Sequence, residues 1–210
     1  SFLKDNLWDD KNKRLYHRWR DGARDDAQIF DTHAYLLSGI VELYGASLKS
    51  EYLSFAIEIA DRMIEAFYDP EAGGFYQSTG TKDLIIRLKE DYDGAEPSGN
   101  SVAVLALLKL AAITGKESYR QTADKTLGYF SGRMKSMAVA VPYMVSAADF
   151  ASREPNRVVI AGSVDSSKAK ELLRAAHSVY QPHKVILGTN GPIEEFAKSL
   201  ADGDKGDVAA

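Results

Sequence analysis

The sequence predicts a mainly α-helical protein in which inner and outer helices alternate, followed by a small β-α-β unit. Helix pairs repeat along residues 1–154, and the pattern changes at Pro155. In each pair, an almost wholly apolar helix precedes an amphipathic one. The first kind must be buried on most sides, the second on one face only. Such pairs joined by short turns are typical of a two-layer helical solenoid or an α/α toroid.

The first predicted pair covers residues 34–46 and 51–67. Apolar and small side chains surround nearly all of 34–46, whereas 51–67 has one apolar face and one charged face. The second pair, 101–113 and 117–134, repeats this plan about 67 residues further along the chain. We therefore expect 34–46 and 101–113 to be inner helices, and 51–67 and 117–134 to be outer helices.

The segments between the pairs contain aromatic residues separated by Asp, Gly, Pro and Asn, which predicts a small β-hairpin in each linker. Gly45 and Gly115 each lie near the end of an inner helix and are predicted left-handed C-caps. Residues 1–7 are expected to end an outer helix. Residues 139–152, with Pro142 in the first turn, are expected to form a third inner helix.

After Pro155 the pattern is that of alternating strands and helices. Residues 157–161 and 184–187 read as buried strands on either side of a helix at 166–179, and a short helix is expected at 192–200. This order predicts a β-α-β unit with a right-handed crossover. The chain accordingly divides into a partial α/α toroid at 1–154, a β-α-β appendage at 155–200 and a flexible tail at 201–210.

Composition excludes several classes of function. The net charge of −4 argues against a nucleic-acid partner, which would need a clustered basic face. The absence of cysteine excludes disulfides, thiolate metal sites and cysteine nucleophiles within this chain. Its apolar runs are too short to span a bilayer, and its start does not resemble a signal peptide. We expect a cytoplasmic protein with no membrane partner, no metal site and no cofactor.

Four carboxylates within seven residues immediately precede the helix predicted at 101–113. In an α/α toroid the inner helices begin at one common mouth. Their N–H groups and positive dipole ends there favour anions and hydroxyl-rich ligands. The candidate residues at or near these helix starts are Asp31, His33, Glu90, Asp91, Asp93, Glu96, Asn100 and Tyr143.

We assign predicted roles to these residues and to two aromatic residues of the linkers. Asp91, Asp93 and Glu96 are predicted to be catalytic, because cleavage of a glycosidic bond requires two carboxylates roughly 5 to 9.5 Å apart. His33 is a candidate general base, since the unperturbed pKa of histidine lies near neutrality. The predicted substrate-binding residues are Asp31, Glu90, Asn100, Trp19 and Tyr76, the last two by stacking on a sugar ring.

The same residues allow a purely structural interpretation. Glu96 or Ser98 would cap a helix that starts at Pro97, while the aspartates order the preceding loop. His33 would make a local hydrogen bond. The aromatic residues would seat each linker on the helices. The sequence leaves both interpretations open.

Several stretches of the chain carry a resemblance to a known family: FDTHAYLLSGIVELY, FYDPEAGGFYQS, DGAEPSGNS, and the closing VVIAG and YQPHKVIL. In these motifs the chain resembles the thioredoxin-domain-containing proteins related to spermatogenesis-associated protein. The resemblance implies a thioredoxin-like domain, which this chain does not include, followed by an α/α toroid like those of six-hairpin glycosidases and N-acylglucosamine 2-epimerases. Family members often have two adjacent acids before the inner helix, whereas this chain has Asp31-Thr32-His33.

The resemblance and the acidic helix starts together favour a carbohydrate-binding or carbohydrate-processing module of a larger thioredoxin-domain-containing protein, with a sugar-like small molecule as ligand. An enzyme of this kind would be glycoside hydrolase-like or sugar epimerase-like. The alternative is a non-catalytic scaffold or partner-binding module that serves the thioredoxin-like domain. The chain supplies about half of the toroid helices that the family implies. We therefore expect it to be part of a longer protein, in which preceding residues or another subunit complete the ring.

Overall fold

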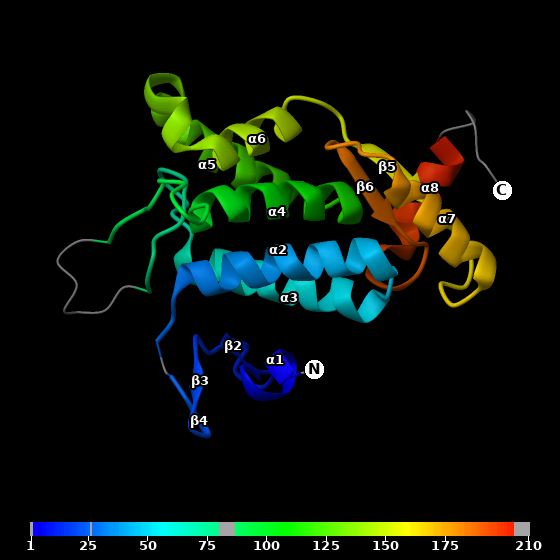
Figure 1. Cartoon of the computed structure of the whole chain (residues 1–210), viewed down its shortest axis with the longest axis horizontal. Helices are drawn as coiled ribbons and strands as arrows, with labels where there is room; N and C mark the ends of the chain where they lie inside the picture. The colour runs from blue at the N-terminus through cyan, green and yellow to red at the C-terminus, as the bar shows by residue number, and fades with distance from the viewer. Residues whose placement is uncertain (1, 26, 80–86, 204–210) are drawn as a thin grey trace.

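The computed structural model describes residues 2–25, 27–79 and 87–203, and it is a mainly helical, partial α/α toroid (Figure 1). The inner layer consists of α2 (Phe30–Ser47), α4 (Gly99–Thr114) and α6 (Pro142–Ala151). The outer helices are α3 (Ser50–Phe67) and α5 (Glu117–Met137). Helix α2 packs against α3 and α4, and α4 packs in turn against α5 and α6. The predicted alternation of inner and outer helices is confirmed.

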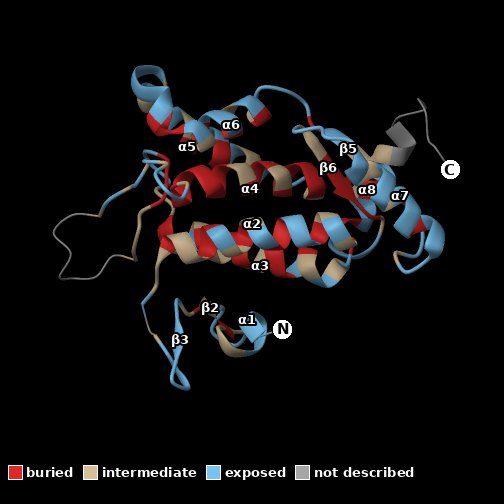
Figure 2. Cartoon of the chain, viewed as in Figure 1, coloured by how far each residue is buried: buried red, intermediate tan, exposed pale blue. Residues whose placement is uncertain are grey.

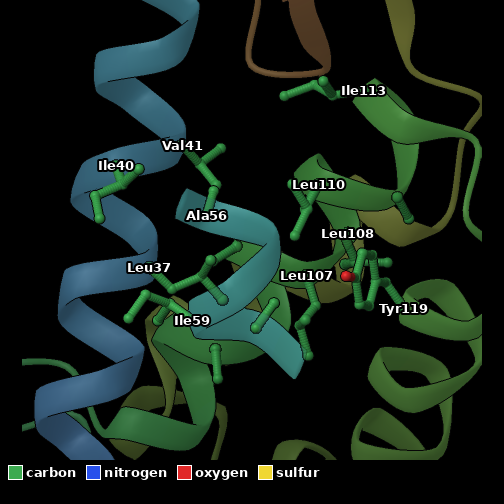
Figure 3. Packing of buried hydrophobic residues seen from close by; sticks show 14 of the residues in the cluster. Leu37, Ile40, Val41, Ala56, Ile59, Leu107, Leu108, Leu110, Ile113 and Tyr119 are labelled. Carbon is green, nitrogen blue, oxygen red and sulfur yellow. The ribbon is translucent and has the colours of Figure 1, made fainter. Parts of the chain in front are cut away.

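Burial follows the sequence pattern. Helix α4 is buried around nearly its whole circumference, whereas α3 and α5 expose one face to solvent (Figure 2). The core is formed where α2, α3 and α4 meet, with Leu37, Ile59 and Leu107 all fully buried (Figure 3). Tyr119 joins α5 to this core, and its hydroxyl donates a 2.6 Å hydrogen bond to Asp61 of α3. Burial of this apolar surface holds the two layers together.

The inner helices α2 and α4 each end in a left-handed residue that turns the chain back onto the outer layer, whereas α6 ends at Ser152 in the right-handed region. At the end of α4 this residue is Gly115, with φ of 70° and its N–H bonded to Ala111 O, as predicted. The prediction for Gly45 is wrong, because α2 continues to Ser47 and Leu48 adopts φ of 55° instead. Leu48 is buried, so packing of its side chain offsets the strain of the left-handed backbone.

The N-terminal segment contains α1 (Phe2–Asn6) and two short antiparallel hairpins. Their strands are β1 (Trp8–Asp9), β2 (Arg14–Leu15), β3 (Trp19–Arg20) and β4 (Ala23–Arg24). Trp8 is buried edge-on against the ring of Phe55, which seats the first hairpin on α3. In the second linker the expected hairpin is reduced, among the described residues, to isolated bridges such as Tyr68 to Phe75.

The C-terminal part is the predicted β-α-β unit, but its first strand is not buried as expected, since Arg157 and Val158 are only half-buried and Val159 is exposed. Strands β5 (Asn156–Val159) and β6 (Lys184–Leu187) pair in parallel and are connected through α7 (Ser167–Ser178). The chain continues through η2 (Gly191–Ile193) into α8 (Glu194–Gly203). Helix α8 takes in residues 201–203 of the predicted tail, and residues 204–210 lie outside the described part of the chain. The division into separate domains stays a prediction.

The β-α-β unit packs on one end of the inner helices. Strand β6 contacts α2 and α4, and its residues Val185 to Leu187 are buried there. The N–H of Gly188 donates a 3.1 Å hydrogen bond to the buried hydroxyl of Tyr44 on α2. The opposite end of the inner layer, where these helices begin, is left to the loops. Over the described ranges, no helix has the length and apolar character needed to cross a membrane.

Candidate functional site

The inner helices begin at one common rim, as the toroid prediction requires. Asp93 connects two of these helix starts. Its Oδ1 accepts the N–H of Ser98 at 2.8 Å, just before α4, and its Oδ2 accepts the N–H of Tyr143 at 2.8 Å in the first turn of α6. The hydroxyl of Tyr35 on α2 donates to Pro97 O at 2.5 Å, which adds the third helix. The rim is therefore a rigid junction of α2, α4 and α6.

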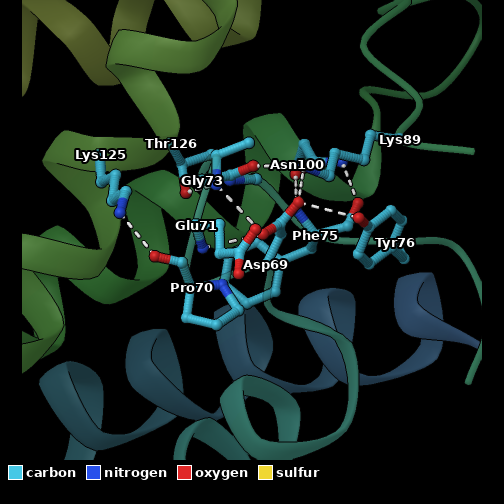
Figure 4. Close-up of polar contacts among 12 residues, drawn as sticks. Asp69, Pro70, Glu71, Gly73, Phe75, Tyr76, Lys89, Asn100, Lys125 and Thr126 are labelled. Carbon is cyan, nitrogen blue, oxygen red and sulfur yellow. Dashed lines mark hydrogen bonds and ion pairs between the residues drawn. The ribbon is translucent and has the colours of Figure 1, made fainter.

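A buried ion pair anchors the linker that leads to this rim (Figure 4). The ammonium of Lys89 lies 2.7 Å from Asp69 Oδ2, and the Lys89 side chain is only 6% exposed. Asp69 also accepts hydrogen bonds from the Tyr76 hydroxyl and from the N–H groups of Glu71 and Ala72. These contacts, that of Lys89 most of all, hold the pKa of Asp69 far below its usual range. The same contacts hold the segment around Asp69 and the segment around Lys89 together before the chain reaches α4.

Asn100, predicted to bind substrate, secures the same linker to α4. Its amide oxygen accepts the N–H of Phe75 at 2.8 Å, and its amide nitrogen donates to Phe75 O and Glu90 O at 3.0 and 2.9 Å (Figure 4). The side chain is fully buried. Both ends of the amide are therefore engaged within the protein.

Of the three acids predicted to be catalytic, two make contacts within the protein and one is exposed to solvent. Both oxygens of Asp93 accept backbone N–H groups, and Asp91 forms a 3.3 Å ion pair with Arg133 of α5. Through these contacts Asp93 and Asp91 hold the loop in place, as the structural interpretation predicts. Ser98 caps α4 by accepting the N–H of Ser101, so the capping alternative applies to Ser98. Glu96 caps nothing, since it is exposed and makes no polar contact with the described residues.

Asp31 has the most unusual surroundings on the rim. Its Oδ1 is buried and has no hydrogen bond of ordinary geometry, although the side chain of Gln77 and the N–H of Gly99 lie close enough to the carboxylate to lower its pKa in part. Burial raises the pKa of Asp31, and the negative charges of Glu90 and Glu96 raise it further. The carboxylate lies against the start of α4, where a Cβ on Gly99 would come within 2.0 Å of Oδ1. Glycine at this position is what allows the close approach.

Two tyrosines accompany these acids, and neither was among the residues predicted from the sequence. Tyr35 lies one turn after Asp31 on the same face of α2, a spacing that could have identified it. Tyr92 is 58% exposed and its ring lies over Gly94, where an added Cβ would come within 2.8 Å of it. The acids Glu90 and Glu96 and these phenol groups together present hydrogen-bonding and aromatic surface at the rim.

His33 points away from the rim. Its ring is fully buried between α2 and α3 and packs edge-on against Phe67, with ring centres 5.0 Å apart. Nδ1 lies 3.0 Å from Ile29 O, which is the local hydrogen bond of the structural alternative. Burial lowers the pKa of His33 to about 4. The ring is therefore neutral at physiological pH, and its buried Nε2 has no described partner.

The two predicted stacking residues differ from each other. Tyr76 is packed between cations, with the guanidinium of Arg87 3.9 Å and the ammonium of Lys89 4.7 Å from its ring centre. Trp19 is partly exposed on β3 and meets Phe2 edge-on. The base of its hairpin is close to the rim, since His17 Nδ1 lies 2.7 Å from Thr32 Oγ1 on α2. Among the described residues, no group of three or more Asp, Glu or His side chains is arranged to hold a metal ion.

Comparison with known proteins agrees with a glycosidase-type architecture. Residues 11–175 match the model of glycosyl hydrolase family 47. The chain belongs to this family. Over 93% of its length it is 33% identical to spermatogenesis-associated protein 20 of Mus musculus, and it covers 26% of that protein. It is also 29% identical, over 51% of its length and 20% of the relative, to the endoplasmic reticulum mannosyl-oligosaccharide 1,2-alpha-mannosidase of Schizosaccharomyces pombe.

A solved structure is also similar to this glycosyl hydrolase family 47 chain. The cellobiose 2-epimerase of Spirochaeta thermophila has a TM-score of 0.48 and 22% identity, covering 61% of this chain and 34% of the epimerase. The chain spans about a quarter of the length of spermatogenesis-associated protein 20. The link to a thioredoxin-like domain stays a prediction.

The rim of this family member carries two different acids: one carboxyl group whose pKa is raised above its ordinary value, and one carboxylate that is exposed to solvent. Asp31 supplies the first and Glu96 the second. A protonated acid donates a hydrogen bond or a proton, whereas an ionised acid accepts one. The arrangement is therefore suited to hydroxyl-rich ligands and to acid/base chemistry on them.

Proposed function

We propose that the rim where α2, α4 and α6 begin binds carbohydrate through Asp31, Glu90 and Glu96. The observation that carries the proposal is the buried Oδ1 of Asp31, which has no hydrogen bond of ordinary geometry, beside two further carboxylates. A buried polar atom without a partner is destabilising, and such atoms are retained at sites that take up a ligand. Tyr35 and Tyr92 would add hydroxyl contacts and an apolar ring face for the sugar.

Membership of a glycosyl hydrolase family supports hydrolysis of a glycosidic bond as the reaction. Asp31 would protonate the oxygen of the departing sugar, because its raised pKa favours the acid form. Glu96 would take a proton from water as the oxygen of that water attacks the anomeric carbon. The buried, neutral His33 gives no comparable support to an epimerase-type base. The relative from Schizosaccharomyces pombe suggests mannose-containing oligosaccharides as the substrate class.

Calorimetric titration with mannose, an α-1,2-linked mannobiose and cellobiose tests the proposal. The variants are Asp31→Asn and Glu96→Gln. Glu51→Gln is the matched control, since Glu51 is exposed in the first turn of α3, at the other end of the helices. We expect saturable binding by the wild type and by the control, and loss of roughly tenfold or more in Asp31→Asn. Equal binding by Asp31→Asn, or no saturable binding of any sugar, contradicts the proposal.

The second candidate is a non-catalytic scaffold or partner-binding module within a larger parent protein in the cytoplasm. It is favoured by the internal contacts of Asp91 with Arg133 and of Asp93 with backbone N–H groups, which leave fewer acids for chemistry. Release of free sugar from the mannobiose separates the two candidates. If the wild-type protein, with the toroid completed by the rest of its parent chain, binds the mannobiose but releases no free sugar, the scaffold is supported.

A further inference from the structure

A cavity lies at the opposite end of the inner helices from the rim. Its volume is about 220 Å³, and it opens between the end of α4, the start of α5, the end of α6 and strand β5. Its apolar wall includes Leu108, Phe150 and Phe196. Its cationic side chains are Lys116, Arg120 and Arg157, and its acidic ones are Glu117 and Glu154.

Backbone carbonyls hold the two arginines in place. Arg157 Nε donates to Ala112 O at 2.9 Å, and Arg120 Nη2 donates to Ala151 O at 2.7 Å. These bonds fix the planes of both guanidinium groups. The two Nη nitrogens of Arg157 donate no hydrogen bond to any described residue. A preformed fork of N–H donors is therefore available at the cavity.

The acids that line the cavity neutralise this charge only in part. Glu154 lies 3.9 Å from Arg157 Nη1, too far for a hydrogen bond, and its side chain is 90% exposed. Glu117 is exposed in the first turn of α5. Asp124, beside the cavity, pairs with Arg120 Nε at 2.8 Å, so the positive charge available to a ligand is chiefly that of Lys116 and Arg157.

We propose that this cavity binds a small organic anion. Its carboxylate or phosphate group bonds to Arg157 with support from Arg120, because the guanidinium fork matches the oxygens of both groups. Its apolar part rests on Phe150 and Phe196, and the ring centre of Phe196 lies 5.9 Å from the Arg157 guanidinium carbon. The cavity volume is below the roughly 300 Å³ of typical drug-sized pockets, so the ligand is no larger than about one ring.

Titration of the chain with benzoate and with phenyl phosphate, followed by NMR, tests this proposal and distinguishes the two anionic groups. Benzyl alcohol serves as the uncharged probe. The variant is Arg157→Gln, and Arg153→Gln is the matched control, because Arg153 is 68% exposed and does not line the cavity. We expect saturable binding of at least one anion, weakened roughly tenfold or more in Arg157→Gln and unchanged in Arg153→Gln.

Three results overturn the proposal: no saturable binding of either anion, equal weakening in the two variants, or equally tight binding of benzyl alcohol. Contacts measured on the wild type decide the question even if Arg157→Gln does not fold. Nuclear Overhauser effects between the probe ring and the rings of Phe150 and Phe196 support it. Effects confined to other residues overturn it.

Discussion

At the residue scale, Asp31 and Asp93 lie on the same rim but have opposite surroundings. Asp93 accepts backbone N–H groups with both oxygens, which stabilises the folded chain. Asp31 buries one oxygen that has no hydrogen bond of ordinary geometry, next to the charges of Glu90 and Glu96. Asp93 therefore stabilises the fold, whereas the buried carboxylate of Asp31 is in an unfavourable environment that a hydrogen-bonding ligand would improve.

The first prediction is that Asp31→Asn does not lower stability at pH 7. The folded-state pKa of Asp31 is raised, so its favourable contribution is present below the unfolded value of 3.8 and is lost as pH rises through the folded value. At neutral pH an uncharged asparagine removes that unfavourable charge. Thermal unfolding at pH 7 should give an equal or higher Tm than the wild type. A Tm as low as that of Asp93→Asn would show that Asp31 is a structural residue.

The second prediction concerns His33 and acid. Burial lowers its folded-state pKa from 6.5 to about 4, so its contribution is present above pH 6.5 and is lost as pH falls through this window. The difference amounts to about 3 kcal/mol of unfolding free energy. Urea unfolding at several pH values should show that the stability of His33→Asn falls less steeply with acid than that of the wild type. Identical pH profiles for His33→Asn and the wild type would contradict the placement of His33.

At the element scale, the starts of α4 and α6 are coupled through the loop that precedes α4. Asp93 bonds to Ser98 at one helix start and to Tyr143 and Met144 at the other. Asn100 and Lys89 also hold this loop, through hydrogen bonds to Glu90 O and Gly73 O. The geometry of the rim therefore depends on contacts that the helices do not make by themselves.

The third prediction is that Asp93→Ala lowers the free energy of unfolding by about 2 kcal/mol, because it leaves helix-start N–H groups of α4 and α6 without their acceptor. Chemical denaturation measures the change, and hydrogen exchange should quicken at Tyr143 and Met144. Glu96→Ala is the control, since Glu96 has no polar contact in the described structure. Equal stability of the two variants would contradict the capping role.

The helices could be predicted from the sequence, because their signals are local. The apolar pattern at 101–113 and Gly115 place α4 within about two residues of its observed ends, Gly99 and Thr114. The bond from Asp93 to Tyr143 joins residues 50 positions apart, and no local pattern encodes it. The burial that separates Asp31 from the exposed Glu96 likewise depends on how the helices pack.

At the scale of the whole molecule, one side of the inner layer is open. Tyr35, Gly39 and Leu43 follow one another at four-residue spacing along α2, and all three are exposed, Leu43 by 45%. The outer helices cover the opposite side of this layer. We propose that further chain of the parent protein or another subunit covers the open side, which agrees with the chain spanning about a quarter of its curated relatives.

The fourth prediction is that the purified 210-residue chain self-associates or binds a hydrophobic dye in its folded state. Exposed apolar surface on α2 is the physical reason. Analytical ultracentrifugation and dye fluorescence measure the two effects, and Leu43→Lys should reduce both. A monomer that melts cooperatively without dye binding would show that the open side needs no partner.

The most direct test of the carbohydrate proposal is an NMR titration of the Asp31 side-chain carboxyl carbon, with and without the tightest-binding sugar. The account predicts a midpoint above the ordinary 3.8 in the free chain and a clear displacement of that midpoint when sugar is bound. A midpoint near 3.8 that is the same in both samples would contradict it.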